Sequence, residues 1–93
     1  MKILAIEIEK KGISNTDFNP HLKNEALKVL EYCENGFIRE IYFDQNNCAI
    51  IIMEANTIIE VREKLNELPL VKNGLIDFEI KELKPYTGFS RLK

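Results

Sequence analysis

The sequence has few of the residues and patterns that mark common functional classes. It contains two cysteines, one histidine and no tryptophan among 93 residues. No apolar run approaches the roughly 20 residues that span a bilayer; the longest covers residues 49–53. The carboxylate of Glu7 interrupts the apolar stretch that a secretory signal requires. We therefore expect a cytoplasmic protein without a membrane partner.

Charge argues against a further class of partner. The chain carries 13 basic and 15 acidic side chains, mixed along its length, and its formal net charge is −2. Proteins that bind the phosphate backbone concentrate lysine and arginine on one face or stripe. The sequence therefore predicts no nucleic-acid partner.

The motifs of several enzyme classes are also absent. No G-x-x-x-x-G-K, G-x-S-x-G or H-E-x-x-H pattern occurs, so nucleotide hydrolysis, serine esterase chemistry and zinc proteolysis have no motif support. Cys33 and Cys48 lack C-x-x-C spacing, and isolated cysteines are more often small buried hydrophobes than disulfide partners or metal ligands. We expect no metal and no cofactor.

Hydrophobic periodicity predicts four strands and two helices. Alternating apolar residues are typical of strands, and spacings of three and four are typical of helices. A cluster of turn-forming residues predicts a loop over residues 10–19. In chain order the predicted elements are a strand at 2–9, a helix at 20–34, a hairpin of strands at 37–43 and 48–53, a helix starting at 57 and ending at 69, and a strand at 75–83.

Capping residues set the predicted ends of the helices. Asn19-Pro20 suits a helix start, and Asn35-Gly36 supplies a left-handed stop. Thr57 and Glu60 match a capping box, and Pro69 marks the end of the second helix. The residues expected to face inward are Leu22, Ala26, Val29, Leu30 and Cys33 in the first helix and Ile58, Val61, Leu65 and Leu68 in the second.

The order strand, helix, hairpin, helix, strand predicts an α+β fold. It is the βαββαβ pattern of a ferredoxin-like domain, with both helices on one face of a four-stranded antiparallel sheet. This domain would cover residues 1–83. Residues 84–93 form a tail that carries Tyr86, Phe89 and Leu92, and we expect it to dock on its own or a neighbouring subunit.

The two strands of the predicted hairpin are apolar on both faces. Ile50 and Ile52 alternate with Ala49, Ile51 and Met53. Helices on one side cannot cover both sets, so something else must cover the second face of the sheet. Symmetric self-association is the commonest way to do so, and we expect a homodimer or a higher homo-oligomer.

The last third of the chain resembles a known family. Leu68-Pro69-Leu70 is followed by Ile76-Asp77-Phe78-Glu79-Ile80 and by Leu83. These motifs resemble the small muconolactone isomerase-like proteins of the dimeric α+β barrel superfamily. The resemblance implies a homodimer whose two four-stranded sheets face each other as a barrel. The haem-degrading branch of that superfamily is disfavoured, because the chain lacks tryptophan and His21 lies at a helix start.

Three residues are candidates for proton transfer. His21 is the one side chain whose ordinary pKa lies near neutrality. Glu7 lies in an apolar strand, where burial would raise its pKa. Tyr42 follows Arg39 and Glu40 in a strand, and its phenol could donate to a developing enolate. The structural alternatives are an exposed first-turn histidine, an ion pair between Glu7 and Arg39, and ordinary core packing or exposure.

Four residues are candidates for substrate binding. Arg39 can hold a carboxylate with two parallel hydrogen bonds, although an intersubunit salt bridge is the competing role. Tyr32 and Glu54 lie near the ends of predicted elements that could border a pocket. Tyr86 would act if the tail closes over a pocket, whereas a packing arm is the alternative.

Three functions remain open on these residues. The first is a cofactor-free isomerase or lyase for a small carboxylate-bearing molecule, such as an organic acid or lactone, which the resemblance supports. The second is a non-catalytic dimeric module that binds a small ligand or another protein. The third is a cofactor-free monooxygenase.

Overall fold

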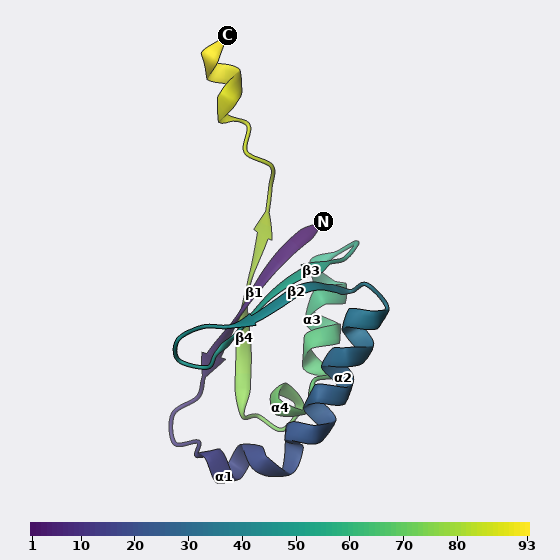
Figure 1. Ribbon diagram of the computed structural model, residues 1–93, viewed down its shortest axis with the longest axis vertical. Helices are drawn as coiled ribbons and strands as arrows, with labels where there is room; N and C mark the ends of the chain where they lie inside the picture. Colours follow the sequence, from purple (N-terminus) through teal and green to yellow (C-terminus); the bar gives the residue numbers. More distant parts are fainter.

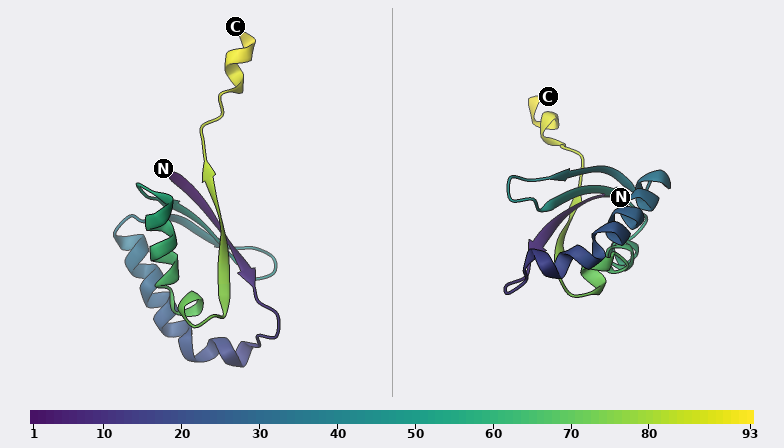
Figure 2. Two further views of the ribbon diagram at one scale, coloured as in Figure 1. Left: turned by 180° about the vertical axis from the view of Figure 1, so that it is seen from behind. Right: turned by 60° about the horizontal axis from the view of Figure 1, so that its bottom comes forward.

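The computed structural model describes residues 1–93 and confirms the predicted fold. The bounds of the elements are β1 (Lys2–Glu9), α1 (Asn15–Phe18), η1 (Asn19–His21), α2 (Leu22–Glu34), β2 (Ile38–Phe43), β3 (Ala49–Glu54), α3 (Ile58–Asn66), α4 (Pro69–Lys72), β4 (Ile76–Leu83) and η2 (Gly88–Leu92), where η marks a 3₁₀ helix. The four strands form one antiparallel sheet in the order β2-β3-β1-β4. Helices α2 and α3 lie side by side on one face of this sheet (Figures 1 and 2).

The core lies between the sheet and the helices. In β1 the odd-numbered Ile3 and Ala5 are fully buried, and cross-strand partners on the same face, including Met53 and Ile51, are buried with them. From the helices, the predicted inward residues Val61, Leu65 and Leu68 are buried. The helices therefore cover the face of β1 that carries Ile3 and Ala5.

The segment before α2 differs from the predicted loop. Ser14 and Asp17 form a capping box that starts α1, with the backbone N–H of Ser14 donating to the Asp17 carboxylate at 2.8 Å. Pro20 lies in the 3₁₀ helix η1, so α2 begins at Leu22, two residues later than expected. The sequence signal at Asn19-Pro20 marks a change of helix type because proline fits the first turn of either kind of helix.

The second predicted helix is two separate helices in the structure, α3 and α4. Thr57 caps α3 as expected, because its hydroxyl oxygen accepts the N–H of Glu60 at 3.1 Å. Pro69, predicted as the helix end, instead opens the short helix α4, where a proline in the first turn loses no required donor. Ile58, predicted to face inward, is exposed.

Helix α2 turns a different face to the sheet than its apolar residues predict. Tyr32 is its one fully buried residue, with Val29 and Glu25 partly buried one and two turns before it. The predicted inward residues Leu22, Ala26, Leu30 and Cys33 are exposed. Burial of the large Tyr32 ring against Phe37, with ring centroids 5.5 Å apart, sets the rotation of the helix.

The two cysteines are not the buried hydrophobes that the sequence predicts. Cys33 is exposed on α2, and Cys48 is partly exposed at the start of β3. Both are free thiols. No helix of the structure has the length and apolar character needed to cross a membrane.

The β2–β3 hairpin contains a bulge that decides which side chains share a face. The register shifts between Ile38 and Glu40, and beyond the shift Ile41 and Phe43 pair with residues of the helix-facing side of β3. Tyr42 pairs with Ile50 and so points to the open face. The bulge thus reverses side-chain direction within β2.

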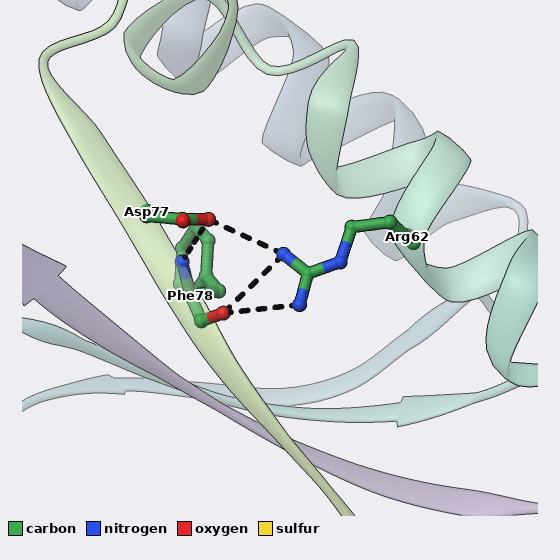
Figure 3. Close-up of polar contacts among 3 residues, drawn as sticks. All are labelled: Arg62, Asp77 and Phe78. Atoms are coloured by element: carbon green, nitrogen blue, oxygen red, sulfur yellow. Dashed lines mark hydrogen bonds and ion pairs between the residues drawn. The ribbon is translucent and has the colours of Figure 1, made fainter.

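Arg62 links α3 to the edge strand β4 through hydrogen bonds. The Arg62 guanidinium donates to the Asp77 carboxylate at 3.2 Å and to the carbonyl of Phe78 at 3.3 Å (Figure 3). An edge strand exposes backbone groups that can pair with another chain. Arg62 donates to one of these backbone groups in β4, the carbonyl of Phe78.

Candidate functional site

The strongest candidate site surrounds Glu7 at the carboxyl end of β1. Glu7 shares the helix-facing side of β1 with Ile3 and Ala5, and it is partly buried. Its Oε1 accepts the backbone N–H of Ala49 at 3.0 Å, where the pairing between β1 and β3 ends. The carboxylate therefore has a fixed position and one oxygen without a hydrogen bond to protein.

The surroundings of Glu7 make its carboxyl less acidic than usual. Burial raises the pKa of Glu7, and the nearby charges of Glu9 and Asp44 raise it further, against the opposing hydrogen bond from Ala49. This agrees in direction with the pKa expected from the sequence. A carboxyl with a raised pKa is suited to both accepting and returning a proton near neutral pH.

A second carboxyl, not predicted from the sequence, faces this region from α2. Burial raises the pKa of Glu25, the N–H of Leu70 opposes the shift, and the charge of Glu7 adds to it. The Glu25 Oε1 accepts the Leu70 N–H at 2.9 Å, at the start of α4. Its spacing of four and seven residues from Val29 and Tyr32 places it on the buried face of α2, and this was the available signal in the sequence.

Cys48 and Glu9 complete the cluster around Glu7. The Cys48 thiol donates to Glu9 at 3.4 Å, and one ligand atom from each of Glu7, Glu9 and Cys48 lies within 4.8 Å of the others. Burial and these carboxylates raise the pKa of the Cys48 thiol to about 11. The spacing would suit a divalent cation. The raised pKa makes the metal-free thiol a poor nucleophile near neutral pH.

An exposed ring lies across β3 from Glu7, on the same face of the sheet. Phe43 pairs with Ala49 across the hairpin and belongs to the helix-facing side of β2. It is 74% exposed, with the partly exposed Ile41 on the same side of the strand. Phe43 and Glu7 flank Ala49 from β2 and β1 on the same face of the sheet, so the ring offers a stacking surface to a planar ligand that extends across β3 to Glu7.

Arg39 and Glu54 lie together at the opposite end of the sheet. Both line an open groove of about 290 Å³ that also includes Glu60 and Lys64. Arg39 donates from Nε to the Gly36 carbonyl at 2.6 Å, and Glu54 pairs with the amino group of Met1 at 3.6 Å. Within one chain Arg39 forms no ion pair with Glu7.

Tyr42 lies on the open face of the sheet, away from the helices. Its hydroxyl donates to the Glu40 carboxylate at 2.7 Å, and this hydrogen bond raises the pKa of Tyr42. Glu7 lies on the other face. One protomer therefore does not bring the two residues together.

The surroundings of Tyr32 indicate a role in packing and not in substrate binding. Its ring is 1% exposed, and its hydroxyl donates to the Lys64 carbonyl at 2.8 Å and to the Glu67 carboxylate at 3.1 Å. Burial and the Glu67 carboxylate raise its pKa well above the usual tyrosine value. The adjacent open groove between α2 and the α3–α4 segment has a volume of about 720 Å³ and is lined mainly by polar and charged residues.

The remaining candidates lie apart from Glu7. His21 directly precedes α2 and is partly exposed. Tyr86 lies in the tail beyond β4 and is largely exposed. The structure thus places Glu25, which was not predicted, in the region of Glu7. Arg39 and Glu54 form a second group. Tyr32, Tyr42 and Tyr86 lie elsewhere.

Comparison with known proteins identifies a structural relative. No protein-family model matches the chain, and no curated protein matches its sequence. Among solved structures, 5-chloro-2-hydroxyhydroquinone dehydrochlorinase from Burkholderia phenoliruptrix AC1100, in complex with 2,5-dihydroxybenzoquinone, is similar with a TM-score of 0.63. The similarity covers 90% of this chain and 94% of that chain at 19% sequence identity. The two proteins share a fold. It is an α+β fold with the element order βαββαβ and one four-stranded antiparallel sheet.

Proposed function

We propose that the protein is a cofactor-free lyase or isomerase that moves a proton next to a carbonyl group in a small, oxygen-rich organic molecule. The observation that carries the proposal is Glu7, a fixed and partly buried carboxyl with a raised pKa and one free oxygen. The dehydrochlorinase of the same fold, solved with a dihydroxybenzoquinone, supports this class of substrate.

Glu7 would act as the general base. It would take a proton from a carbon next to the carbonyl, and the electron pair of the broken C–H bond would move into the carbonyl to give an enolate. The proton then returns to a different carbon in an isomerisation, or a leaving group departs with the electron pair in an elimination. The raised pKa favours this cycle because it makes the Glu7 carboxylate a stronger base than an ordinary one.

Phe43 and Glu25 would complete the site around Glu7. The exposed Phe43 ring offers a stacking surface for a planar substrate beside Ala49. Glu25 faces the same region, and the charge of Glu7 contributes to the raised pKa of Glu25. The roles predicted for Arg39 and Tyr42 require another copy to supply them, because in one protomer they lie away from Glu7.

We further propose that the protein acts as a homodimer whose sheets face each other. The open face carries Leu4, Ile6 and Ile8 in β1 opposite Ile50 and Ile52 in β3. Ile8 and Tyr42 on this face are exposed in one chain. A contiguous apolar surface of this kind is typical of a protein–protein interface.

The test begins with a thermal-shift screen of hydroxyquinones, lactones and small unsaturated acids. A ligand that binds the folded state raises its apparent stability by mass action. The ligands found are then incubated in D₂O, and deuterium incorporation or product formation is followed by NMR. Glu7→Gln should abolish the reaction while keeping an oxygen that can accept the Ala49 N–H.

Glu63→Gln is the matched control, since Glu63 is an exposed carboxyl on α3. It should leave the reaction unchanged. A Glu7→Gln protein that turns over a substrate as fast as the parent would remove Glu7 from the mechanism. Light scattering at several concentrations gives the mass of the assembly, and a monomer throughout would contradict the homodimer.

A non-catalytic binding module is the second candidate function. The two grooves described above are open and lined largely by polar and charged side chains. Catalytic and cofactor sites are more often concave and largely apolar. A ligand that stabilises the protein equally in the parent and in Glu7→Gln, with no turnover in either, would favour this function.

A further inference from the structure

We propose that residues 84–93, the C-terminal arm, pack on the outer face of α2 in a neighbouring copy of the chain. The receiving surface is the α2 stripe, defined as Leu22, Ala26, Leu30 and Cys33. This packing does not depend on the proposed chemistry at Glu7. It would also occupy a different surface from the open face of the sheet.

The C-terminal arm has an apolar surface that its own domain does not cover. It continues from β4 and extends away from the sheet and the helices (Figure 1). Tyr86 and Phe89 are each 71% exposed, and Leu92 is 82% exposed. None of the three belongs to the core or packs against it.

The arm is locally ordered. Residues Gly88–Leu92 form a 3₁₀ helix, in which positions three apart lie on one edge. The Tyr86 ring packs against Gly88, where a Cβ would have no room, and meets the Phe89 ring edge-on with centroids 4.9 Å apart. The two rings alone offer roughly 300 Å² or more of mostly apolar area.

The α2 stripe is an apolar surface without a cover. Its residues are spaced by four, four and three positions, which places them along one side of the helix. All four are exposed, because the inward side of α2 is occupied by Glu25, Val29 and Tyr32. Exposed apolar stripes of this kind mark interaction surfaces.

Charge favours the arm as the occupant of a surface on this protein. The arm carries Lys84, Arg91 and Lys93 and no acidic side chain, a charge of +3. Since the whole chain has a formal net charge of −2, residues 1–83 carry −5. Glu34 directly follows the stripe at the end of α2. The opposite net charges of the arm and of residues 1–83 favour their association, although Lys23 and Glu34 at the two ends of the stripe balance each other.

Topology favours a neighbouring copy over the same chain. The arm leaves the sheet from β4, which is one edge strand, whereas α2 packs against β2 at the other edge. The arm also lengthens the molecule to 56 Å, against 27 and 20 Å in the other two directions. A segment directed away from its own α2 is placed to reach another molecule.

Cys33 provides a native reporter for this packing. In a Cys48→Ser background Cys33 is the one thiol, so its reaction rate with a thiol reagent measures access to the α2 stripe. We expect at least a tenfold slower reaction in the full chain than in the Phe89→Ser/Leu92→Ser variant. Thr87→Ala, which removes a side chain that makes no capping hydrogen bond in the arm, should keep the protection.

A cross-link identifies which copy supplies the arm. Isotopically labelled Leu92→Cys/Cys33→Ser/Cys48→Ser protein is mixed with unlabelled Cys48→Ser protein and oxidised. A disulfide between labelled position 92 and unlabelled Cys33, identified by mass spectrometry, is the expected result. Equal thiol reaction rates with and without the apolar arm residues would overturn the proposal.

The alternative of packing within one chain is tested by Leu92→Cys/Cys48→Ser protein mixed from labelled and unlabelled stocks. If every 92–33 disulfide in this mixture joins positions with the same label, and the cross-link between separate proteins does not form, the arm packs on its own α2 and the proposal is wrong. The variants change residues outside the core, so circular dichroism should match the parent.

Discussion

Glu25→Ala should lower the free energy of unfolding by about 1–3 kcal/mol, because it leaves the backbone N–H of Leu70 without its partner. Leu70 is 8% exposed, so little water can replace the carboxylate. For a domain of this size each 1 kcal/mol corresponds to roughly 4–8 °C in Tm. Urea unfolding followed by circular dichroism measures the change.

Glu25→Gln separates the hydrogen bond from the charge. The amide oxygen can still accept the Leu70 N–H, so this variant should lose far less stability than Glu25→Ala at pH 7. Burial raises the pKa of Glu25 above its usual value of 4.5 in the folded protein. The folded state therefore holds the proton more tightly than the unfolded state.

The sign of the pH dependence follows from this difference. The contribution of protonated Glu25 is complete below about pH 4.5, its unfolded value, and is lost as the pH rises through the raised pKa of the folded state. Glu25→Gln cannot lose a proton, so its stability relative to the parent should increase between pH 4 and pH 7. A relative stability that is the same at both pH values would refute the argument that Glu25 is desolvated.

Three further substitutions test the contacts around the helices. Tyr32→Phe should cost about 1–2 kcal/mol, because it removes the hydroxyl that donates to the Lys64 carbonyl, without altering ligand affinity in a thermal-shift titration. Thr57→Ala should cost about 1 kcal/mol through loss of the cap of α3, measured by urea unfolding. Arg62→Ala should cost about 1 kcal/mol or less, since its contacts with β4 are partly exposed, and a loss above about 3 kcal/mol in the same assay would contradict that view.

The fold was predictable because local signals agree with one another along most of the chain. Alternation in residues 2–9 and 75–83 predicts strands, and the structure has β1 and β4 there. The Thr57 cap and the positive φ of Gly36 mark helix ends at the expected places. Short segments were harder, since α1 and α4 have four residues each and depend on a single cap or proline.

The candidate site was predictable only in part. Glu7 stands out because a carboxylate interrupts the apolar face of a strand, and burial by itself raises the pKa of a carboxyl. Glu25 does not stand out, because α2 has several charged residues and only the rotation of the helix makes this one face the sheet. The hydrogen bond from Leu70 involves residues 45 positions apart, and no local pattern predicts such a contact.

Two apolar surfaces stay exposed within one chain: the α2 stripe and the C-terminal arm. The same physical argument applies to both. The periodicity of Leu22, Ala26, Leu30 and Cys33 predicts a buried face, but periodicity does not specify which surface buries it. The apolar residues of the C-terminal arm likewise gain from leaving water, whichever surface receives them. If the arm of one copy covers the α2 stripe of another, both patterns are satisfied in the assembly. The prediction that this side of α2 is buried would then be correct. The covering surface would be the arm of another copy and not the sheet of the same chain.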